Sequence, residues 1–291
     1  MKTEKAIDHV KTFLALIRVR NCTMTYIGVL LGASFINPGD IFTFKVLLAA
    51  AAAFVITGAG NVINDYYDYE IDKINRPHRA IPSNKISKSD AWMLSVTMFA
   101  IGLGMSNVNV YCLGLAICNT AVLIVYGKYS KRMYLLANLI VSYLVASIFI
   151  YGALANVSGE FLELEKTQLV AILSGCAFFA TLSREIVKDI EDMEGDKKKY
   201  SVTLPIQMGA KRARDIASTF LLTAIALSAL PLLIPSHYFN TLLYLVPVAI
   251  ADLIFLSSMN MRPAPAQKTM ILGMTMAIIA FFAGEIGTKL L

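Results

Sequence analysis

Nine stretches of mostly apolar residues run through this chain, and most are long enough to cross a lipid bilayer as helices. A membrane-crossing helix needs about 20 predominantly apolar residues. The stretches cover residues 13–36, 45–63, 90–105, 110–126, 135–155, 167–187, 214–235, 238–258 and 269–290. Charged residues make up only 16% of the chain, whereas a soluble domain carries about 25%. The pattern predicts an all-α membrane bundle of nine transmembrane helices, forming a single domain over residues 1–291.

The basic residues are distributed unevenly between the two ends of these predicted helices. The side that holds the N-terminus receives 23 of the 26 Lys and Arg residues, and only Lys45, Lys166 and Lys289 fall on the other side. Such an excess marks the cytoplasmic face of a membrane protein. We therefore expect a multi-pass protein of the cell membrane with a cytoplasmic N-terminus, cytoplasmic active-site loops and an outside C-terminus. The net charge of +6 follows from this topology and indicates no nucleic-acid partner.

Acidic residues are sparse, yet two segments, 64–72 and 189–196, are rich in them. Both contain the spacing Asp-x-x-Asp-x-x-x-Asp. The aspartates of the first motif are Asp65, Asp68 and Asp72, and those of the second are Asp189, Asp192 and Asp196. The second motif lies 124 residues after the first, and each follows the same end of a predicted helix. The chain is therefore expected to contain two pseudo-repeats of four helices each.

The spacing within each motif has a chemical meaning. Residues three, four and seven apart share one face of a helix, so each motif is predicted to present a stripe of three carboxylates. Like charges at this spacing repel, and a cation is expected between them. Oxygen ligands favour Mg²⁺ or Ca²⁺, and Mg²⁺ completes its shell with water and phosphate oxygens. Two stripes facing across a central cavity that opens to the cytoplasmic side would hold a diphosphate through bridging Mg²⁺ ions.

Basic residues next to the motifs add to this prediction. Arg79 follows the first motif and Lys188 immediately precedes the second. A diphosphate leaving group develops negative charge that metal ions and Arg or Lys side chains stabilise. Arg18 and Arg20 lie just inside the first predicted helix. A charge there is costly and often functional, although a long side chain can also reach back to the membrane interface.

At these residues the chain resembles the UbiA superfamily of intramembrane prenyltransferases. The first signature of that superfamily, Asn-Asp-x-x-Asp-x-x-x-Asp, is matched at 64–72, and the second, Asp-x-x-Asp-x-x-x-Asp, is matched at 189–196. The stretch 126–132 is similar to the superfamily's Tyr-Ser-x-x-Leu-Lys-Arg, with Gly127 and Ser130 as departures. The resemblance extends over the whole chain in helix number and motif position.

The resemblance implies a role for each matching residue, with Mg²⁺ as the cofactor. The catalytic residues implied are Asp68, Asp72, Asp192 and Asp196. The metal ligands implied are these four together with Asp65 and Asp189. The residues implied for the donor diphosphate are Asn64, Arg79, Tyr126, Lys131 and Lys188. For the phosphate of an acceptor, Arg18 and Arg20 are the candidates. The group that removes the acceptor proton, diphosphate or carboxylate, stays open.

Two longer strings, 64–83 and 183–205, resemble the branch of the superfamily that makes the second ether bond of archaeal membrane lipids. This resemblance implies a geranylgeranyl diphosphate donor and a lipid-like acceptor, the free hydroxyl of geranylgeranylglyceryl phosphate. An aromatic or quinone-precursor acceptor of the 4-hydroxybenzoate type stays open, as does a chlorophyll-synthase-like acceptor. Cation transport is disfavoured because transporter sites lie near the bilayer midplane, whereas both motifs lie at helix ends.

Overall fold

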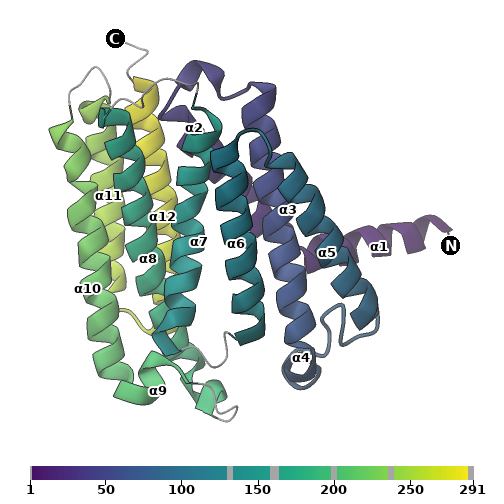
Figure 1. The fold of residues 1–291 in the computed structure, drawn as a ribbon. Helices are drawn as coiled ribbons and strands as arrows, with labels where there is room; N and C mark the ends of the chain where they lie inside the picture. Colours follow the sequence, from purple (N-terminus) through teal and green to yellow (C-terminus); the bar gives the residue numbers. More distant parts are fainter. Residues whose placement is uncertain (1, 130–133, 158–163, 198–201, 235–238, 288–291) are drawn as a thin grey trace.

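The computed structural model describes residues 2–129, 134–157, 164–197, 202–234 and 239–287. In these residues the chain is helical and contains no strand (Figure 1). The helices before the middle of the chain are α1 (Lys2–Leu16), α2 (Val19–Ser34), η1 (Pro38–Asp40), α3 (Phe44–Tyr67), α4 (Tyr69–Asn75), α5 (Lys88–Met105) and α6 (Val110–Tyr129). Those after it are α7 (Tyr134–Ala155), α8 (Leu164–Lys197), α9 (Leu204–Met208), α10 (Ala210–Ser228), η3 (Leu230–Leu233), α11 (Thr241–Ser258) and α12 (Pro263–Ile286).

Among the described residues, seven helices are long and apolar enough to cross a membrane. They are α3, α6, α7, α8, α11, α12 and the run formed by α10 and η3. The pair α1 and α2 is an eighth candidate, bent by 57° at a short break. The prediction of an all-helical, multi-pass membrane protein is confirmed. Its ninth span, 90–105, falls on α5, which lies outside this set of candidates.

The first predicted span, 13–36, is not one continuous helix. The chain breaks at Arg18, whose backbone adopts the left-handed conformation with φ 54° and ψ 62°. For a residue other than glycine this conformation costs roughly 1–2 kcal/mol, so contacts elsewhere must hold it. Helix α1 projects sideways from the bundle (Figure 1) and exposes Val10, Phe13 and Leu14. A helix that exposes apolar side chains in this way is typical of one lying in the membrane interface.

The two halves of the bundle meet where α2 crosses α7. A Cβ atom on Gly32 would lie 2.1 Å from the backbone oxygen of Phe149, and one on Gly152 would lie 2.0 Å from that of Val29. Small residues at crossings let membrane helices approach each other closely. This crossing of α2 and α7, called the seam below, is therefore a backbone-to-backbone contact that only glycine permits at these two positions. On either side of it, α2 packs against α3 and α7 packs against α8.

The helices that carry the two motifs end on the same side of the molecule. Figure 1 shows α4, which follows α3, and α9, which follows α8, at one end of the bundle. The last turn of α12 lies toward the opposite end. The arrangement brings both motifs to one end of the bundle.

Candidate active site

The first motif spans the junction between two helices. Helix α3 ends at Tyr67, Asp68 forms the junction with φ −79° and ψ 0°, and α4 begins at Tyr69. The helical register continues, because the Asp68 amide donates to the Asn64 carbonyl at 2.9 Å and the Asp72 amide donates to the Asp68 carbonyl at 2.8 Å. Asp65, Asp68 and Asp72 are all buried. Three buried carboxylates require partners, since an isolated buried charge is strongly unfavourable.

Arginine side chains provide partners for two of them. Nη1 of Arg79 donates to Asp72 Oδ2 at 2.6 Å and to Asp65 Oδ1 at 3.1 Å. Nη2 of Arg18 donates to the same Asp65 oxygen at 2.8 Å. The sequence predicts a metal cation between these carboxylates, whereas a guanidinium group bridges Asp65 and Asp72 here. The repulsion between the two carboxylates is offset by Arg79, because the loop after α4 turns back toward the motif.

Asn61, which sequence reasoning missed, links this network to the bend in the first span. Its side-chain amide donates to the Ile17 carbonyl at 2.8 Å, and its oxygen accepts from Nη1 of Arg18 at 3.4 Å. Both partners lie at the break between α1 and α2, so Asn61 holds the strained backbone of Arg18 in place. A polar residue one helical turn before Asp65, inside an apolar helix, is the signal that would have identified it.

Asn64 and Asp68 form the second contact within the first motif. The Asn64 amide donates to Asp68 Oδ2 at 3.2 Å. The side chain of Asn64 therefore orients a carboxylate. This arrangement places the side-chain oxygen of Asn64 beside Asp68 as a neutral oxygen ligand, which suits a site for a hard cation.

The second motif lies within a helix rather than after one. Helix α8 continues through the motif to Lys197, about ten residues past the predicted end of the sixth span. Asn138 of α7, a second residue missed from the sequence, donates to Asp189 Oδ2 at 2.8 Å. Asp192 is exposed, and the side chain of Asp196 lies outside the described residues. The first aspartate of each motif thus accepts a hydrogen bond from an earlier segment of the chain, Asp65 from Arg18 at the break before α2 and Asp189 from Asn138 of α7.

A third missed residue, Glu185, lies one turn before Asp189 and is buried. Lys188, which is exposed, approaches Glu185 Oε2 at 3.4 Å, and Arg184 pairs with the other oxygen of the same carboxylate. Glu185 lies 124 residues after Asn61, the same offset that relates the motifs. Applying that offset one turn upstream would have identified it.

Tyr126 lies near charged residues of both motifs, Asp68 in the first and Asp189 on α8, and also near Glu185 and Arg18. The next residue, Gly127, brings α6 against α3: a Cβ there would lie 3.3 Å from Tyr67 Cδ2. The departure at Gly127 from the superfamily's pattern therefore has a packing reason. Lys131, also predicted for this site, lies outside the described residues.

The predicted acceptor residues Arg18 and Arg20 diverge. Arg18 points into the network of the first motif, whereas Arg20 is exposed on α2. The structure therefore brings Arg18 together with the first motif and leaves Arg20 apart from it.

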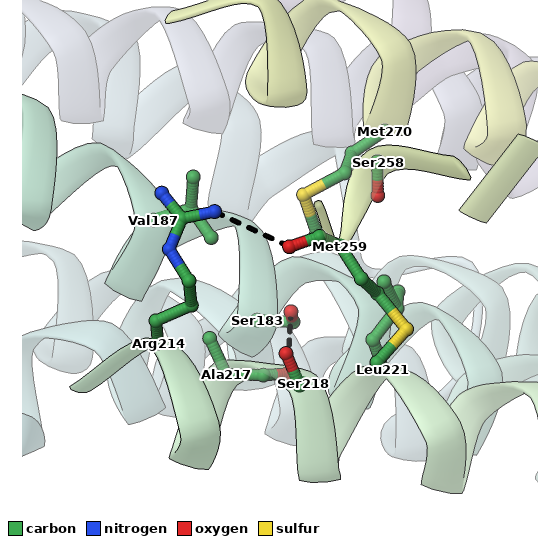
Figure 2. Close-up of a pocket in the computed structure, with 9 residues that line it drawn as sticks. All are labelled: Ser183, Val187, Arg214, Ala217, Ser218, Leu221, Ser258, Met259 and Met270. Atoms are coloured by element: carbon green, nitrogen blue, oxygen red, sulfur yellow. Dashed lines mark hydrogen bonds between the residues drawn. The ribbon is translucent and has the colours of Figure 1, made fainter. Parts of the chain in front are cut away.

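Behind the second motif, α8 is fixed to its neighbours by a packing joint (Figure 2). Ser183 of α8 donates to the Ala217 carbonyl of α10 at 2.7 Å. Nη1 of Arg214 donates to the carbonyls of Met261 and Met259, at 2.6 and 3.2 Å, where α11 ends. The cavity between these residues is about 10 Å³, roughly room for one water molecule. The hydrogen bonds position α8, and the cavity is too small for a substrate.

The donor atoms present fit Mg²⁺ when it binds together with a diphosphate. In the part of the chain that the structure describes, no three Asp, Glu, His or Cys side chains form a closed metal site. Mg²⁺ does not need one, because it typically takes one or two carboxylates and completes its octahedron with water and substrate phosphate. Asp68 and Asn64 of the first motif and Asp192 on α8 offer carboxylate and amide oxygens. These are oxygen ligands of the kind that Mg²⁺ prefers.

A multi-pass helical bundle with an aspartate motif at the same end of α3 and α8 is typical of an intramembrane enzyme that binds an anionic substrate through a metal ion. The chain belongs to the UbiA prenyltransferase family, whose model matches residues 25–279. The predicted superfamily, and with it a membrane prenyltransferase, is confirmed.

Relatives with known names agree with this membership. Digeranylgeranylglyceryl phosphate synthase of Methanococcus aeolicus is 41% identical over 250 residues, which are 85% of each chain. A solved structure concerning digeranylgeranylglyceryl phosphate synthase in membranes superposes with a TM-score of 0.81 at 35% identity and covers 96% of this chain and 99% of that one. A UbiA homolog from Archaeoglobus fulgidus, bound to DMAPP and Mg²⁺, shares the fold with a TM-score of 0.65 at 17% identity, over 94% and 98% of the two chains.

Proposed function

We propose that this chain transfers a geranylgeranyl group from geranylgeranyl diphosphate to the free hydroxyl of geranylgeranylglyceryl phosphate. The product carries the second ether bond of archaeal membrane lipids. The observation that carries the proposal is the pair of aspartate motifs at one end of the bundle. The acceptor is supported by the synthase that matches 85% of the chain at 41% identity.

The proposed architecture has nine spans in one domain, with two pseudo-repeats around a central cavity that opens to the cytoplasm. Helix α5 supplies the ninth span: it packs against α3 on one side and exposes Trp92, Met93, Val96 and Ile101 on the other. An apolar outer face of this kind suits contact with lipid. The excess of Lys and Arg supports a cytoplasmic N-terminus and an outside C-terminus.

In the proposed donor site, Asp68 and Asp72 of the first motif face Asp192 and Asp196 of the second across the diphosphate. Bound Mg²⁺ would neutralise part of the diphosphate charge. Asn64 orients Asp68 through the hydrogen bond at 3.2 Å. Tyr126 and Lys131 are proposed to contact the diphosphate. Asp65 and Asp189 are the outer members of the set, and Asp65 already holds two arginines.

The reaction breaks the allylic C–O bond of the donor and sends its electron pair to the diphosphate. Arg79 and Lys188 are the residues proposed to stabilise the charge that grows there. The acceptor hydroxyl oxygen then attacks the allylic carbon, and the new ether bond forms. The hydroxyl proton leaves to the diphosphate or to a carboxylate of the motifs.

The acceptor phosphate is proposed to lie near the first helix break. Arg18 is the cation that reaches the first motif from this region, and Arg20 stays the second predicted residue. A phosphate monoester carries up to two negative charges, and Arg binds such groups through its planar fork of donors.

The acceptor assignment is tested by offering several acceptors side by side. The purified enzyme in nanodiscs receives radiolabelled geranylgeranyl diphosphate, Mg²⁺, and either geranylgeranylglyceryl phosphate, 4-hydroxybenzoate or a chlorophyllide. We expect label only in the product of the glyceryl phosphate. Prenylation of the aromatic ring with no transfer to the glyceryl phosphate would overturn the acceptor but leave the prenyltransferase standing.

A further inference from the structure

A cavity of about 490 Å³ lies between α1 and the segment that follows α4. Lys11 and Thr12 line it from α1, Arg18 from the helix break, and His78, Arg79 and Lys85 from the segment after α4. Asp65 of the first motif also contributes to its wall. The cavity therefore borders the donor site, because Asp65 belongs to both.

The charge of this cavity is positive. Four Lys and Arg side chains line it against two carboxylates, those of Asp8 and Asp65. Asp65 is already shared by Arg18 and Arg79. Among the described residues, Lys11 and Lys85 make no salt bridge with a carboxylate, so their charges are available to a ligand. A lined hollow with several converging cations favours an anion with more than one negative charge.

The position of the cavity favours an anion carried by a membrane lipid. Helix α1, one of its walls, leaves the bundle sideways and exposes Val10, Phe13 and Leu14. An amphipathic helix of this kind lies at the boundary between headgroups and acyl chains. A cavity beneath it is therefore at the depth of a lipid phosphate, with the hydrocarbon region beside it for the lipid tail.

We propose that this cavity binds the phosphate monoester headgroup of the acceptor lipid, with Lys11 and Lys85 as the residues that grip it. The inference rests on the proposed function and adds residues from α1 and from the segment after α4. Its volume is in the range of small-molecule sites and has room for a glycerol together with its phosphate. Arg18 and Asp65, which both line the cavity, join it to the first motif, so the acceptor hydroxyl would lie next to the donor.

The test compares Lys11→Gln, Lys85→Gln and the double variant with wild type in nanodiscs of neutral lipid. With geranylgeranylglyceryl phosphate as acceptor, we expect each single variant to raise the acceptor KM by about tenfold, because a charge-assisted hydrogen bond is lost. The donor KM and the kcat at saturating acceptor stay within twofold of wild type. Lys211→Gln, on the exposed face of α10 and outside the cavity lining, serves as the matched control and keeps the wild-type acceptor KM.

A binding measurement separates headgroup recognition from a general loss of activity. Without donor, wild type should bind geranylgeranylglyceryl phosphate more tightly than geranylgeranylglycerol, which lacks the phosphate. The double variant should bind the two equally. The single variant Lys85→Arg, which keeps the charge, should keep the preference for the phosphate-bearing lipid. Its binding also shows that a change at position 85 leaves the protein folded.

Three outcomes decide the matter. Wild-type enzyme that does not use geranylgeranylglyceryl phosphate at all overturns the proposed function. Wild-type turnover together with an unchanged acceptor KM in the double variant overturns the cavity assignment alone. An effect of the variants that is seen only when the nanodiscs contain anionic phosphatidylglycerol assigns the cavity to bulk lipid headgroups, and it also overturns the acceptor proposal.

Discussion

At Asp65 two arginines that are far apart in the sequence converge on one carboxylate oxygen. Arg18 comes from the break before α2, and Arg79 comes from the segment after α4. Arg79 continues to Asp72, so one buried network ties the first span, the motif helix and the following loop together. Asp65 thus organises the cations of the site, and Arg79 links it to Asp72.

This role predicts a stability effect for Asp65→Asn. The substitution leaves Arg18 and Arg79 without their shared charge, and breaking one side of a largely buried ion pair costs on the order of 3 kcal/mol. We expect a clear drop in the thermal unfolding midpoint of the purified protein. Glu70→Gln is the control, because its pair with Lys73 is exposed at both ends and such pairs contribute about 0–1 kcal/mol. Equal midpoints for the two variants would show that Asp65 does not hold the network.

At the residue scale the sequence predicts which side chains belong to the candidate site, but it predicts few of their hydrogen-bond partners. Arg79 lies seven residues after Asp72, so their contact follows from a short loop turning back. The bond from Arg18 to Asp65 spans 47 residues and depends on a left-handed backbone at Arg18, which no local pattern indicates. The bond from Asn138 to Asp189 spans 51 residues and needs the packing of α7 on α8.

At the scale of the elements, the two halves of the bundle depend on one helix crossing. Gly152→Ala would place a methyl group 2.0 Å from a backbone oxygen of α2, so the helices must separate. We expect a loss of about 1–3 kcal/mol, the usual cost of overpacking, measured as a lower unfolding midpoint in detergent. Gly114→Ala is the matched control, since nothing lies within 4 Å of its added Cβ and alanine favours a helix by about 1 kcal/mol. A Gly152→Ala protein as stable as the control would refute the seam.

The boundaries of the elements differ from the predicted ones for a physical reason. Hydropathy follows the membrane, so the sixth predicted span stops at 187, where charged residues begin. The backbone follows hydrogen bonding and propensity, and Glu and Lys are good helix formers, so α8 continues to Lys197. The first predicted span is apolar on both sides of Arg18, and its break is invisible to hydropathy.

For the whole molecule, the distribution of basic residues predicts one orientation in the membrane. A cysteine at Ser87, at the start of α5, should react with a membrane-impermeant reagent only from the cytoplasmic side. One at Phe42, exposed before α3, should react only from outside. The background carries Cys118→Ala, because Cys118 is the exposed one of the four cysteines, all of which lie in described helices. The reverse labelling pattern would place the proposed site on the wrong face of the membrane.

The central claim is that carboxylates from both halves and Mg²⁺ act together on one prenyl diphosphate. Its most direct test is geranylgeranyl transfer by purified wild type, Asp68→Asn and Asp192→Asn, with Asp215→Asn of the exposed face of α10 as the control. We expect each motif variant to lose at least about 100-fold in kcat/KM, the scale of losing one electrostatic contact in a transition state, and EDTA to abolish turnover by wild type and control alike. Wild-type rates in either motif variant, or undiminished transfer in EDTA, would contradict the account.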